Sequence, residues 1–277
     1  MMDVRVAFLG NSILYFNDCP RLLEAISAPD VRVVHDCCLQ GGANLAKLLA
    51  KGSNMFQPSE ASERDDGTHD VGATTVEGLL EQAGGWDFVI VQDHTQAPAR
   101  SKTQLEGINV LKNELAPMID STGAIPILLA THAYREPVKG SEEFGTVPEF
   151  TRALRDGYSK YASTLAIALP EDKTPRVAPF GTAMLRVHEE RPALWRELFD
   201  SDNFHLSPIG TFLEACVLHH TIFGKPPPVP SEPIAQLWAR SRRMGRPGEP
   251  PLRFPSAEEC DYLRNVATRV CSESQLV

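Results

Sequence analysis

The sequence predicts an α/β fold, a three-layer α/β/α sandwich of the flavodoxin-like kind with about five parallel strands between two layers of helices. Short apolar runs rich in β-branched residues alternate along the chain with longer segments whose apolar residues recur at helical spacing. The first run, 4–9, is apolar at nearly every position, which is typical of a strand covered on both faces. Polar or glycine-containing turns follow several of these runs, at the place where open α/β sheets bind their ligands.

The predicted elements alternate in chain order. The expected strands are 4–9, 31–36, 88–92, 125–130 and 176–179. The expected helices are 20–26, 41–49, 75–83, 103–118, 146–165, 191–199 and 207–223. Capping boxes at Thr103 with Glu106 and at Thr146 with Glu149 indicate two of the helix starts, and Ser207 followed by Pro208 indicates a third.

A proline-rich segment after Gly224 divides the predicted domain from a tail. We therefore expect one α/β domain over 1–225 and a linker with a helical extension over 226–277. A short basic helix is expected over 234–243, and Ser256 with Glu259 predicts the start of an amphipathic helix. Its apolar stripe could pack on the domain or against a second copy in a homo-oligomer, and the sequence leaves both open; the stripe consists of Leu263, Val266, Ala267 and Val270.

The polar segment 52–73 is too long for a plain connection in a compact domain. It could be a solvated loop or a lid that contacts substrate, and the residues in it best able to touch a ligand are Met55, Phe56 and His69.

Composition excludes several classes of function. The chain has 277 residues and a net charge of -9 without a basic stripe, which argues against a nucleic-acid partner. It has no apolar run of about eighteen residues and no signal-peptide pattern, so we expect a cytoplasmic protein with no membrane partner. Its six cysteines are irregularly spaced without C-x-x-C, so neither a disulfide framework nor a metal site is predicted, and no cofactor is expected.

A serine directly follows the first predicted strand. Gly10 lets the backbone turn sharply there, and Asn11 and Ser12 come next, at the carboxyl end of the strand. By itself Gly10-Asn11-Ser12 could be no more than a polar turn before a helix.

A second pair of residues changes that interpretation. Asp202 precedes His205 by three residues on a loop just before the helix that begins at Pro208. Serine is a weak nucleophile unless an imidazole takes its proton and a carboxylate holds that imidazole in place. Ser12, His205 and Asp202 supply those three roles.

These blocks resemble those of the SGNH (GDSL-like) hydrolases, and the resemblance covers most of residues 4–225. In that family a first block GDS or GNS carries the nucleophile, which matches Gly10-Asn11-Ser12. A second block supplies an oxyanion-hole glycine, for which Gly42 is the better match in Gly41-Gly42-Ala43-Asn44, and the last block matches Asp202 and His205. The resemblance implies a catalytic triad of Ser12, His205 and Asp202, with Ser12 and Gly42 in the oxyanion hole.

The third block departs from the family pattern. That family usually has Gly-x-Asn-Asp after the third strand, whereas this chain has Val91-Gln92-Asp93-His94. Gln92 carries the same amide donor on a longer stem, so we assign it the third oxyanion-hole position, with Thr95, Gln96 or His94 as alternatives. Substrate contacts are expected from residues at the same edge of the sheet, although a histidine at 132 is more often structural; these residues are Asn11, His94, His132 and Tyr134.

The sequence thus predicts a serine esterase that removes a short acyl group, most simply acetyl, from a carbohydrate-like or small polar substrate through an acyl-enzyme. The substrate class follows from the family resemblance alone. An acyltransferase would use the same triad, and a binding module with little or no activity is the alternative that Gln92 favours. Nucleotide binding is not supported, because the first turn lacks G-x-G-x-x-G. A classical α/β-hydrolase is excluded because Leu14 replaces the second glycine of G-x-S-x-G.

Overall fold

A computed structural model describes residues 2–29, 31–54, 62–63, 69–70, 72–230, 234–237 and 252–274. Its main sheet has five strands in the order β2-β1-β5-β6-β7, and each strand pairs in parallel with its neighbour. The strands are β1 (Met2–Gly10), β2 (Val31–Leu39), β5 (Phe88–Val91), β6 (Ile125–Leu129) and β7 (Arg176–Ala178). All five predicted strands and the predicted fold class are confirmed.

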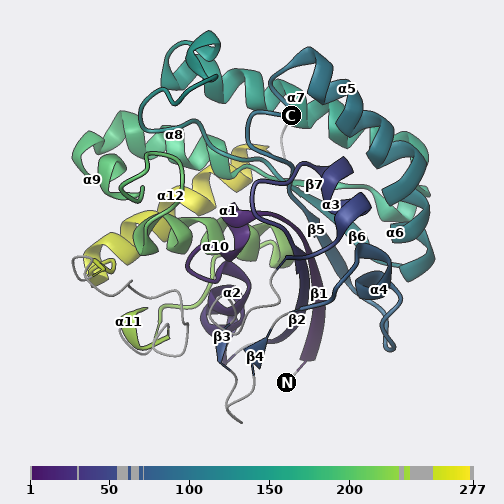
Figure 1. Ribbon diagram of the computed structural model, residues 1–277. Helices are drawn as coiled ribbons and strands as arrows, with labels where there is room; N and C mark the ends of the chain where they lie inside the picture. Colours follow the sequence, from purple (N-terminus) through teal and green to yellow (C-terminus); the bar gives the residue numbers. More distant parts are fainter. Residues whose placement is uncertain are drawn as a thin grey trace.

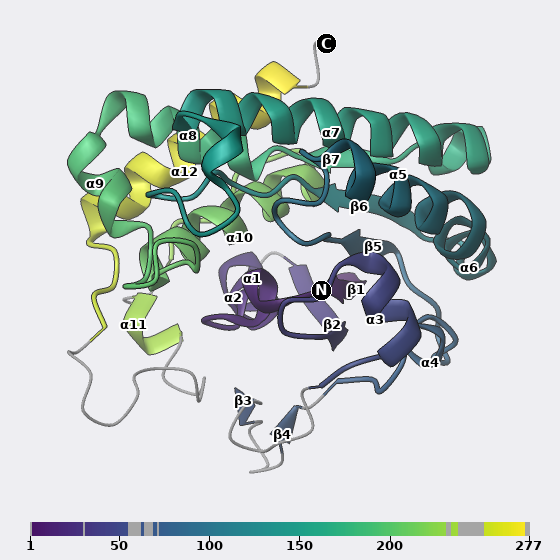
Figure 2. The same cartoon turned by 45° about the horizontal axis from the view of Figure 1, so that its top comes forward.

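Helices cover both faces of this sheet, as Figures 1 and 2 show. The central strand β1 explains why, because its side chains alternate between two hydrophobic clusters. Val4, Val6 and Phe8 belong to one cluster, whereas Ala7 and Leu9 belong to the other. The near-continuous apolar run in the sequence is therefore the pattern of a strand buried on both sides.

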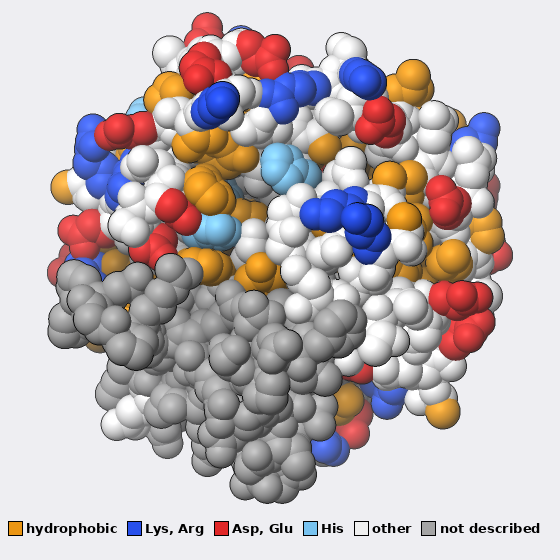
Figure 3. Space-filling view, viewed as in Figure 1, with side chains coloured by type: hydrophobic (Ala, Val, Ile, Leu, Met, Phe, Trp, Pro, Cys, Tyr) orange, Lys and Arg blue, Asp and Glu red, His pale blue; other side chains and the backbone are white. Residues whose placement is uncertain are grey.

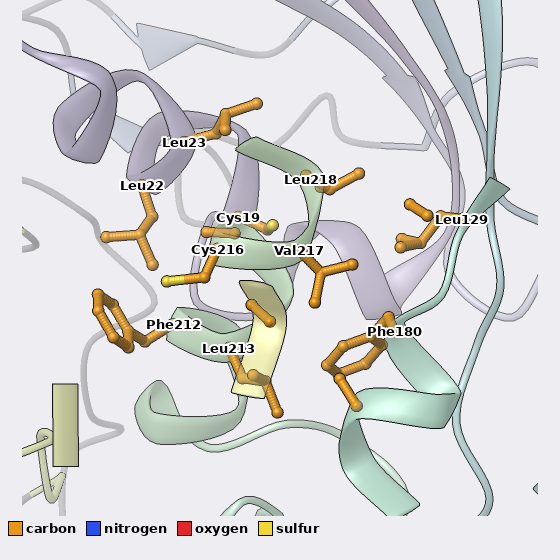
Figure 4. Close-up of a cluster of buried hydrophobic side chains, with 14 of the residues drawn as sticks. Cys19, Leu22, Leu23, Leu129, Phe180, Phe212, Leu213, Cys216, Val217 and Leu218 are labelled. Atoms are coloured by element: carbon orange, nitrogen blue, oxygen red, sulfur yellow. The ribbon is translucent and has the colours of Figure 1, made fainter. Parts of the chain in front are cut away.

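The first face is covered by α2 (Cys19–Ser27), α8 (Phe180–Glu190), α10 (Pro208–Phe223) and α12 (Ala257–Ser274). Figure 4 shows Leu22 of α2, Phe180 of α8, Phe212 of α10 and Leu129 of β6 within one cluster of buried side chains. α10 is buried along nearly its whole length. The predicted N-cap of α10 is confirmed, because the Ser207 side chain accepts from the backbone N–H groups of Ile209 and Gly210.

The second face is covered by α3 (Leu45–Lys51), α4 (Val76–Leu80), α5 (Ser101–Val110), α6 (Ala116–Thr122) and α7 (Val147–Ala168). A π-helical turn, Leu111–Leu115, joins α5 to α6, so the predicted single helix is continuous but locally unwound. α7 begins with the predicted capping box of Thr146 and Glu149. The capping box predicted at Thr103 is wrong: α5 begins two residues earlier, and the Thr103 hydroxyl donates to the Ala97 and Arg100 carbonyls instead.

α12 packs back on the domain. Its stripe residues, including Leu263 and Val266, are fully buried in the same cluster as α8 and α10. The reciprocal hydrogen bonds of Ser256 and Glu259 confirm its predicted capping box. The structure thus decides between the two placements left open by the sequence, and the stripe is not left exposed for a second subunit. The division into 1–225 and an extension remains a prediction.

The remaining described elements are short: α1 (Ser12–Tyr15), β3 (Ser62–Glu63), β4 (His69–Asp70), α9 (Pro192–Glu197), α11 (Ile234–Leu237) and the 3₁₀ turns Glu142–Phe144 and Glu171–Lys173. Met55, Phe56 and most of the predicted helix 234–243 lie outside the described residues, as does the side chain of His69. Among the described residues, no helix is both long enough and apolar enough to cross a membrane.

The strand order places one edge of the sheet at a topological switch. The chain passes from β1 outward to β2 and then returns to the other side of β1 for β5. Segments leaving the carboxyl ends of β1 and β5 therefore diverge and leave room for a ligand between them. The turns that carry Ser12, Gly42 and His94 all follow strands at this edge.

Candidate active site

A hydrogen bond with the Gln92 side chain holds the turn that follows β1. The Gln92 side-chain oxygen accepts from the Asn11 backbone N–H at 3.0 Å, and the Asn11 side chain donates to the Ala43 carbonyl at 2.9 Å. A Cβ on Gly10 would lie 2.6 Å from the Gln92 oxygen, so any larger residue would displace the Gln92 side chain from this position. Asn11 also caps α1 by accepting from Ile13, which leaves Ser12 as the first residue of that helix.

The loop before α10 presents an acid and a histidine in contact. His205 Nδ1 lies 2.6 Å from a carboxylate oxygen of Asp202, and the other carboxylate oxygen accepts from the backbone N–H groups of Phe204 and His205. Burial raises the pKa of Asp202, but these hydrogen bonds outweigh burial and hold it below its ordinary value. Asp202 therefore stays ionised at neutral pH and fixes Nδ1 of His205 as the protonated nitrogen.

The second ring nitrogen of His205 has no partner within the described structure. Nε2 is buried and receives no hydrogen bond from the described residues. A buried polar atom without a partner is uncommon in a native structure and needs an explanation, which a role in proton transfer would supply. A histidine whose Nδ1 is bound to a carboxylate and whose Nε2 is open is arranged as a general base.

Two contacts connect the Ser12 helix to the His205 loop. Phe16, which follows α1, donates its backbone N–H to the Ser12 carbonyl, and its ring stacks on the His205 imidazole at 4.2 Å between centroids. The Asn17 side chain donates to the Leu206 carbonyl at 2.7 Å. The structure thus brings Ser12 and His205 to the same edge of the sheet. The sequence analysis did not predict the contacts of Phe16 and Asn17 that connect them.

A cavity of about 190 Å³ lies beside Ser12. Of the predicted site residues, Asn11, Ser12, Gly42, His94 and Tyr134 line it, together with Thr95 and Gln96. Burial raises the pKa of Tyr134, although hydrogen bonds with Gln96 and Thr95 oppose the rise. The phenol therefore stays protonated and can donate or accept in the cavity.

Gln92 does not fill the position predicted for it. Its side-chain oxygen is bound to Asn11, its nitrogen donates to the Asp93 carbonyl, and it is not among the residues lining the cavity. Because backbone groups engage both the oxygen and the nitrogen of its amide, Gln92 holds the turn that carries Ser12 and does not face the cavity. The three alternatives to it, His94, Thr95 and Gln96, do line the cavity.

The prediction that His132 contacts substrate is also wrong. His132 is fully buried, and its Nε2 lies 2.9 Å from the Phe204 carbonyl, to which it donates. Burial lowers the pKa of His132 to about 4, with the hydrogen bond to Phe204 opposing that effect. A neutral histidine that binds the carbonyl just before His205 is a support for the loop that carries Asp202 and His205.

Asp93 is a buried centre that the sequence did not reveal. Its carboxylate accepts from the N–H groups of Leu45 and His94 and from the Tyr161 hydroxyl at 2.8 Å. Burial raises its pKa to about 6, against the effect of these hydrogen bonds. Through these hydrogen bonds the Asp93 carboxylate links α3, α7 and the loop after β5 beside the site. The polar run after the predicted third strand was the only sequence signal for it.

Comparison with known proteins shows which proteins have a similar fold. No family model and no curated protein matches the sequence. A crystal structure of a DUF4886 family protein from Bacteroides uniformis is similar with a TM-score of 0.66 and 16% identity, over 97% of this chain and 94% of that one. A presumed SGNH hydrolase from Slackia heliotrinireducens is similar with a TM-score of 0.53 and 25% identity, over 79% of this chain and 99% of that one.

The fold is therefore that of the SGNH hydrolases, with a five-stranded parallel sheet between helices. The resemblance of the sequence blocks to the SGNH (GDSL-like) superfamily is confirmed at this level. The likeness to this neighbour supports an activity of the hydrolase type.

Proposed function

We propose that this protein is a serine esterase that hydrolyses a short acyl ester, most simply an acetyl ester, of a carbohydrate-like or small polar molecule through an acyl-enzyme. The observation that carries the proposal is His205, whose Nδ1 is bound to Asp202 while its buried Nε2 is open, on a ring stacked against the residue that ends the Ser12 helix. Phe204, the neighbour of His205 in the chain, lines the cavity beside Ser12, whereas His205 itself does not.

In the proposed mechanism His205 Nε2 takes the proton of Ser12 as the hydroxyl attacks the ester carbonyl, and Asp202 stabilises the imidazolium that forms. The Phe16 ring, stacked on the imidazole, adds a favourable cation–π contact to the charged form. Protonated His205 then gives its proton to the leaving alcohol. Water repeats the sequence to release the acid and free Ser12.

The oxyanion would be met by the backbone N–H groups of Ser12 and Gly42, with a third donor from His94, Thr95 or Gln96, all of which line the cavity. Each donor aimed at developing negative charge contributes about 100-fold to 1000-fold to turnover. Loss of the usual third-block asparagine therefore does not by itself argue against catalysis.

The test measures hydrolysis of p-nitrophenyl acetate by the wild type and by Ser12→Ala and His205→Ala. Both variants should lose at least about 1000-fold in kcat/KM. Ser159→Ala, on an exposed part of α7, is the matched control and should keep wild-type activity. Equal rates in the wild type and both site variants would overturn the proposal and favour a binding module.

A fluorophosphonate probe identifies the nucleophile independently of turnover. Peptide mass spectrometry should find the label on Ser12, and Ser12→Ala should remain unlabelled. Label on any other serine in the wild type would contradict the assignment. Adding an alcohol acceptor to the assay and quantifying its acyl ester separates hydrolysis from acyl transfer, which requires the same residues.

A further inference from the structure

A second cavity adjoins the one beside Ser12. It measures about 210 Å³ and shares Gly42 and His94 with its neighbour. The residues that belong to it alone are Asn44, Lys47, Ala97, Arg100 and Thr103. A ligand whose ester bond lies at Ser12 can therefore extend past Gly42 and His94 into this second space.

The second cavity is basic. Lys47 and Arg100 line it, and no acidic side chain among the described residues does. Basic side chains gather over α3 on this face of the molecule (Figure 3). Within the described part of the chain, the Lys47 ammonium has no ion-pair partner.

Arg100 is partly neutralised and firmly held. Its Nε donates to Glu143, its Nη2 donates to the Gly140 carbonyl, and its guanidinium lies 4.8 Å from the Phe144 ring centroid. Arg100 lines the cavity, whereas Glu143 does not. The buried Asp93 carboxylate beneath His94 is already engaged by three hydrogen-bond donors.

The positive field of these side chains reaches the catalytic cavity. Burial lowers the pKa of His94, and the charges of Arg100 and Lys47 lower it further. The charge of Arg100 also opposes the burial-driven rise in the pKa of Tyr134. Both affected side chains face the space beside Ser12. A negative charge on a bound ester would be attracted by the same field.

We propose that the natural substrate is an ester that also carries an anionic group, a carboxylate or a phosphate, and that Lys47 and Arg100 bind this group in the second cavity. This inference rests on the proposed esterase function and narrows its substrate class. Lys47 supplies an exposed ammonium that can follow the ligand, whereas Arg100 supplies a fixed planar donor. The anionic group can belong to the acyl part or to the alcohol part of the ester.

The experiment compares matched anionic and neutral esters. One pair, 4-acetoxybenzoate and its methyl ester, puts the charge on the alcohol part, and a second pair, mono-4-nitrophenyl glutarate and 4-nitrophenyl pentanoate, puts it on the acyl part. The measured quantity is the ratio of kcat/KM for the anionic ester to that for its neutral partner. For at least one pair, the wild type should give a ratio greater than one.

Lys47→Gln should lower that ratio by about threefold to tenfold, because an exposed charge contact is worth modest energy. Lys47→Gln combined with Arg100→Gln should lower it further, and about 0.5 M salt should lower it in the wild type. Lys51→Gln, on the same helix but outside the cavity, is the control and should keep the wild-type ratio. Equal ratios in the wild type and Lys47→Gln for both pairs would overturn the subsite.

A binding measurement separates failure of the subsite from failure of the esterase function. Ser12→Ala is titrated calorimetrically with 4-acetoxybenzoate and mono-4-nitrophenyl glutarate, with and without Lys47→Gln. A Kd that rises by about threefold or more on loss of Lys47 supports the subsite even if the wild type hydrolyses neither ester. An unchanged Kd for both probes overturns it, whatever the hydrolysis assays show.

Discussion

His132 and Glu214 are both fully buried, and burial moves their pKa values in opposite directions. The pKa of His132 falls to about 4, whereas that of Glu214 on α10 rises to about 8. Neither Glu214 oxygen receives a well-formed hydrogen bond from the described residues, although the Cys19 thiol is close enough to lower that pKa slightly. Both side chains are therefore neutral in the folded protein near pH 7.

Ionisation of Glu214 lowers the stability of the fold as pH rises, and protonation of His132 lowers it as pH falls. An unfolded glutamic acid ionises near about pH 4.3, so the contribution of Glu214 is full below that value and is lost as pH rises toward its folded pKa of about 8. An unfolded histidine gains a proton below about pH 6.5, so the contribution of His132 is lost as pH falls from there toward about 4.

Glu214→Gln should remove the alkaline part of this dependence. Because glutamine resembles the protonated acid and cannot ionise, the variant should gain stability relative to the wild type by about 2 kcal/mol or more between pH 5 and pH 8. Urea unfolding at the two pH values measures the difference. Glu189→Gln, at an exposed position, is the control and should show no such change. A constant difference between wild type and Glu214→Gln would contradict a buried, protonated Glu214.

His132→Leu tests the support of the catalytic loop. It leaves the Phe204 carbonyl without its donor, so we expect a loss of about 1 to 3 kcal/mol in the free energy of unfolding. Turnover of p-nitrophenyl acetate should also fall, because the carbonyl lies next to His205. His132→Gln retains an N–H donor and should recover part of both losses. Full activity in a folded His132→Leu would show that the hydrogen bond does not position His205.

Among the elements, α12 shows how a segment after a proline-rich linker becomes part of the core. Its apolar stripe faces α8 and α10, and Arg269 pairs with Glu190 of α8 at 2.8 Å at the edge of the contact. α10 lies between α12 and the sheet, which is why it is buried nearly all round and carries Glu214 at a fully buried position.

Leu263→Ala tests the contribution of α12 to stability. Removing a fully buried leucine side chain should cost about 2 to 5 kcal/mol in the free energy of unfolding. Leu105→Ala on α5 removes the same atoms from a side chain that is 59% exposed and should cost much less. Chemical denaturation of both variants measures the contrast. Similar small losses at both positions would mean that α12 is not integral to the folded domain.

At the scale of the whole molecule, the strand order determines where chemistry can occur. The switch between β1 and β5 brings the turns after β1, β2 and β5 to one edge of the sheet, and the loop before α10 closes this edge through Phe16 and Asn17. Two adjoining cavities result, one beside the candidate nucleophile and one with basic walls.

Much of this was predictable from sequence, because hydrophobic periodicity and capping residues act locally. The five strands and the starts of α7, α10 and α12 follow from such patterns. α8 was not predicted, and it begins directly after Pro179, the last residue of the predicted fifth strand. Thr103 was predicted to cap a helix and does not, because its hydroxyl donates to carbonyl groups of the preceding loop.

The sequence by itself determined the fold class, and it pointed to the three residues proposed as the triad and to the glycine turn before Ser12, because each of these patterns lies within a few neighbouring residues. Only the tertiary structure decided that Gln92 supports the turn that carries Ser12, that His132 is a buried support and that Lys47 and Arg100 line one cavity. Hydrogen bonds and fields between segments far apart in sequence set those roles. These interactions depend on which strand ends lie next to each other in the sheet, and a local sequence pattern does not predict that.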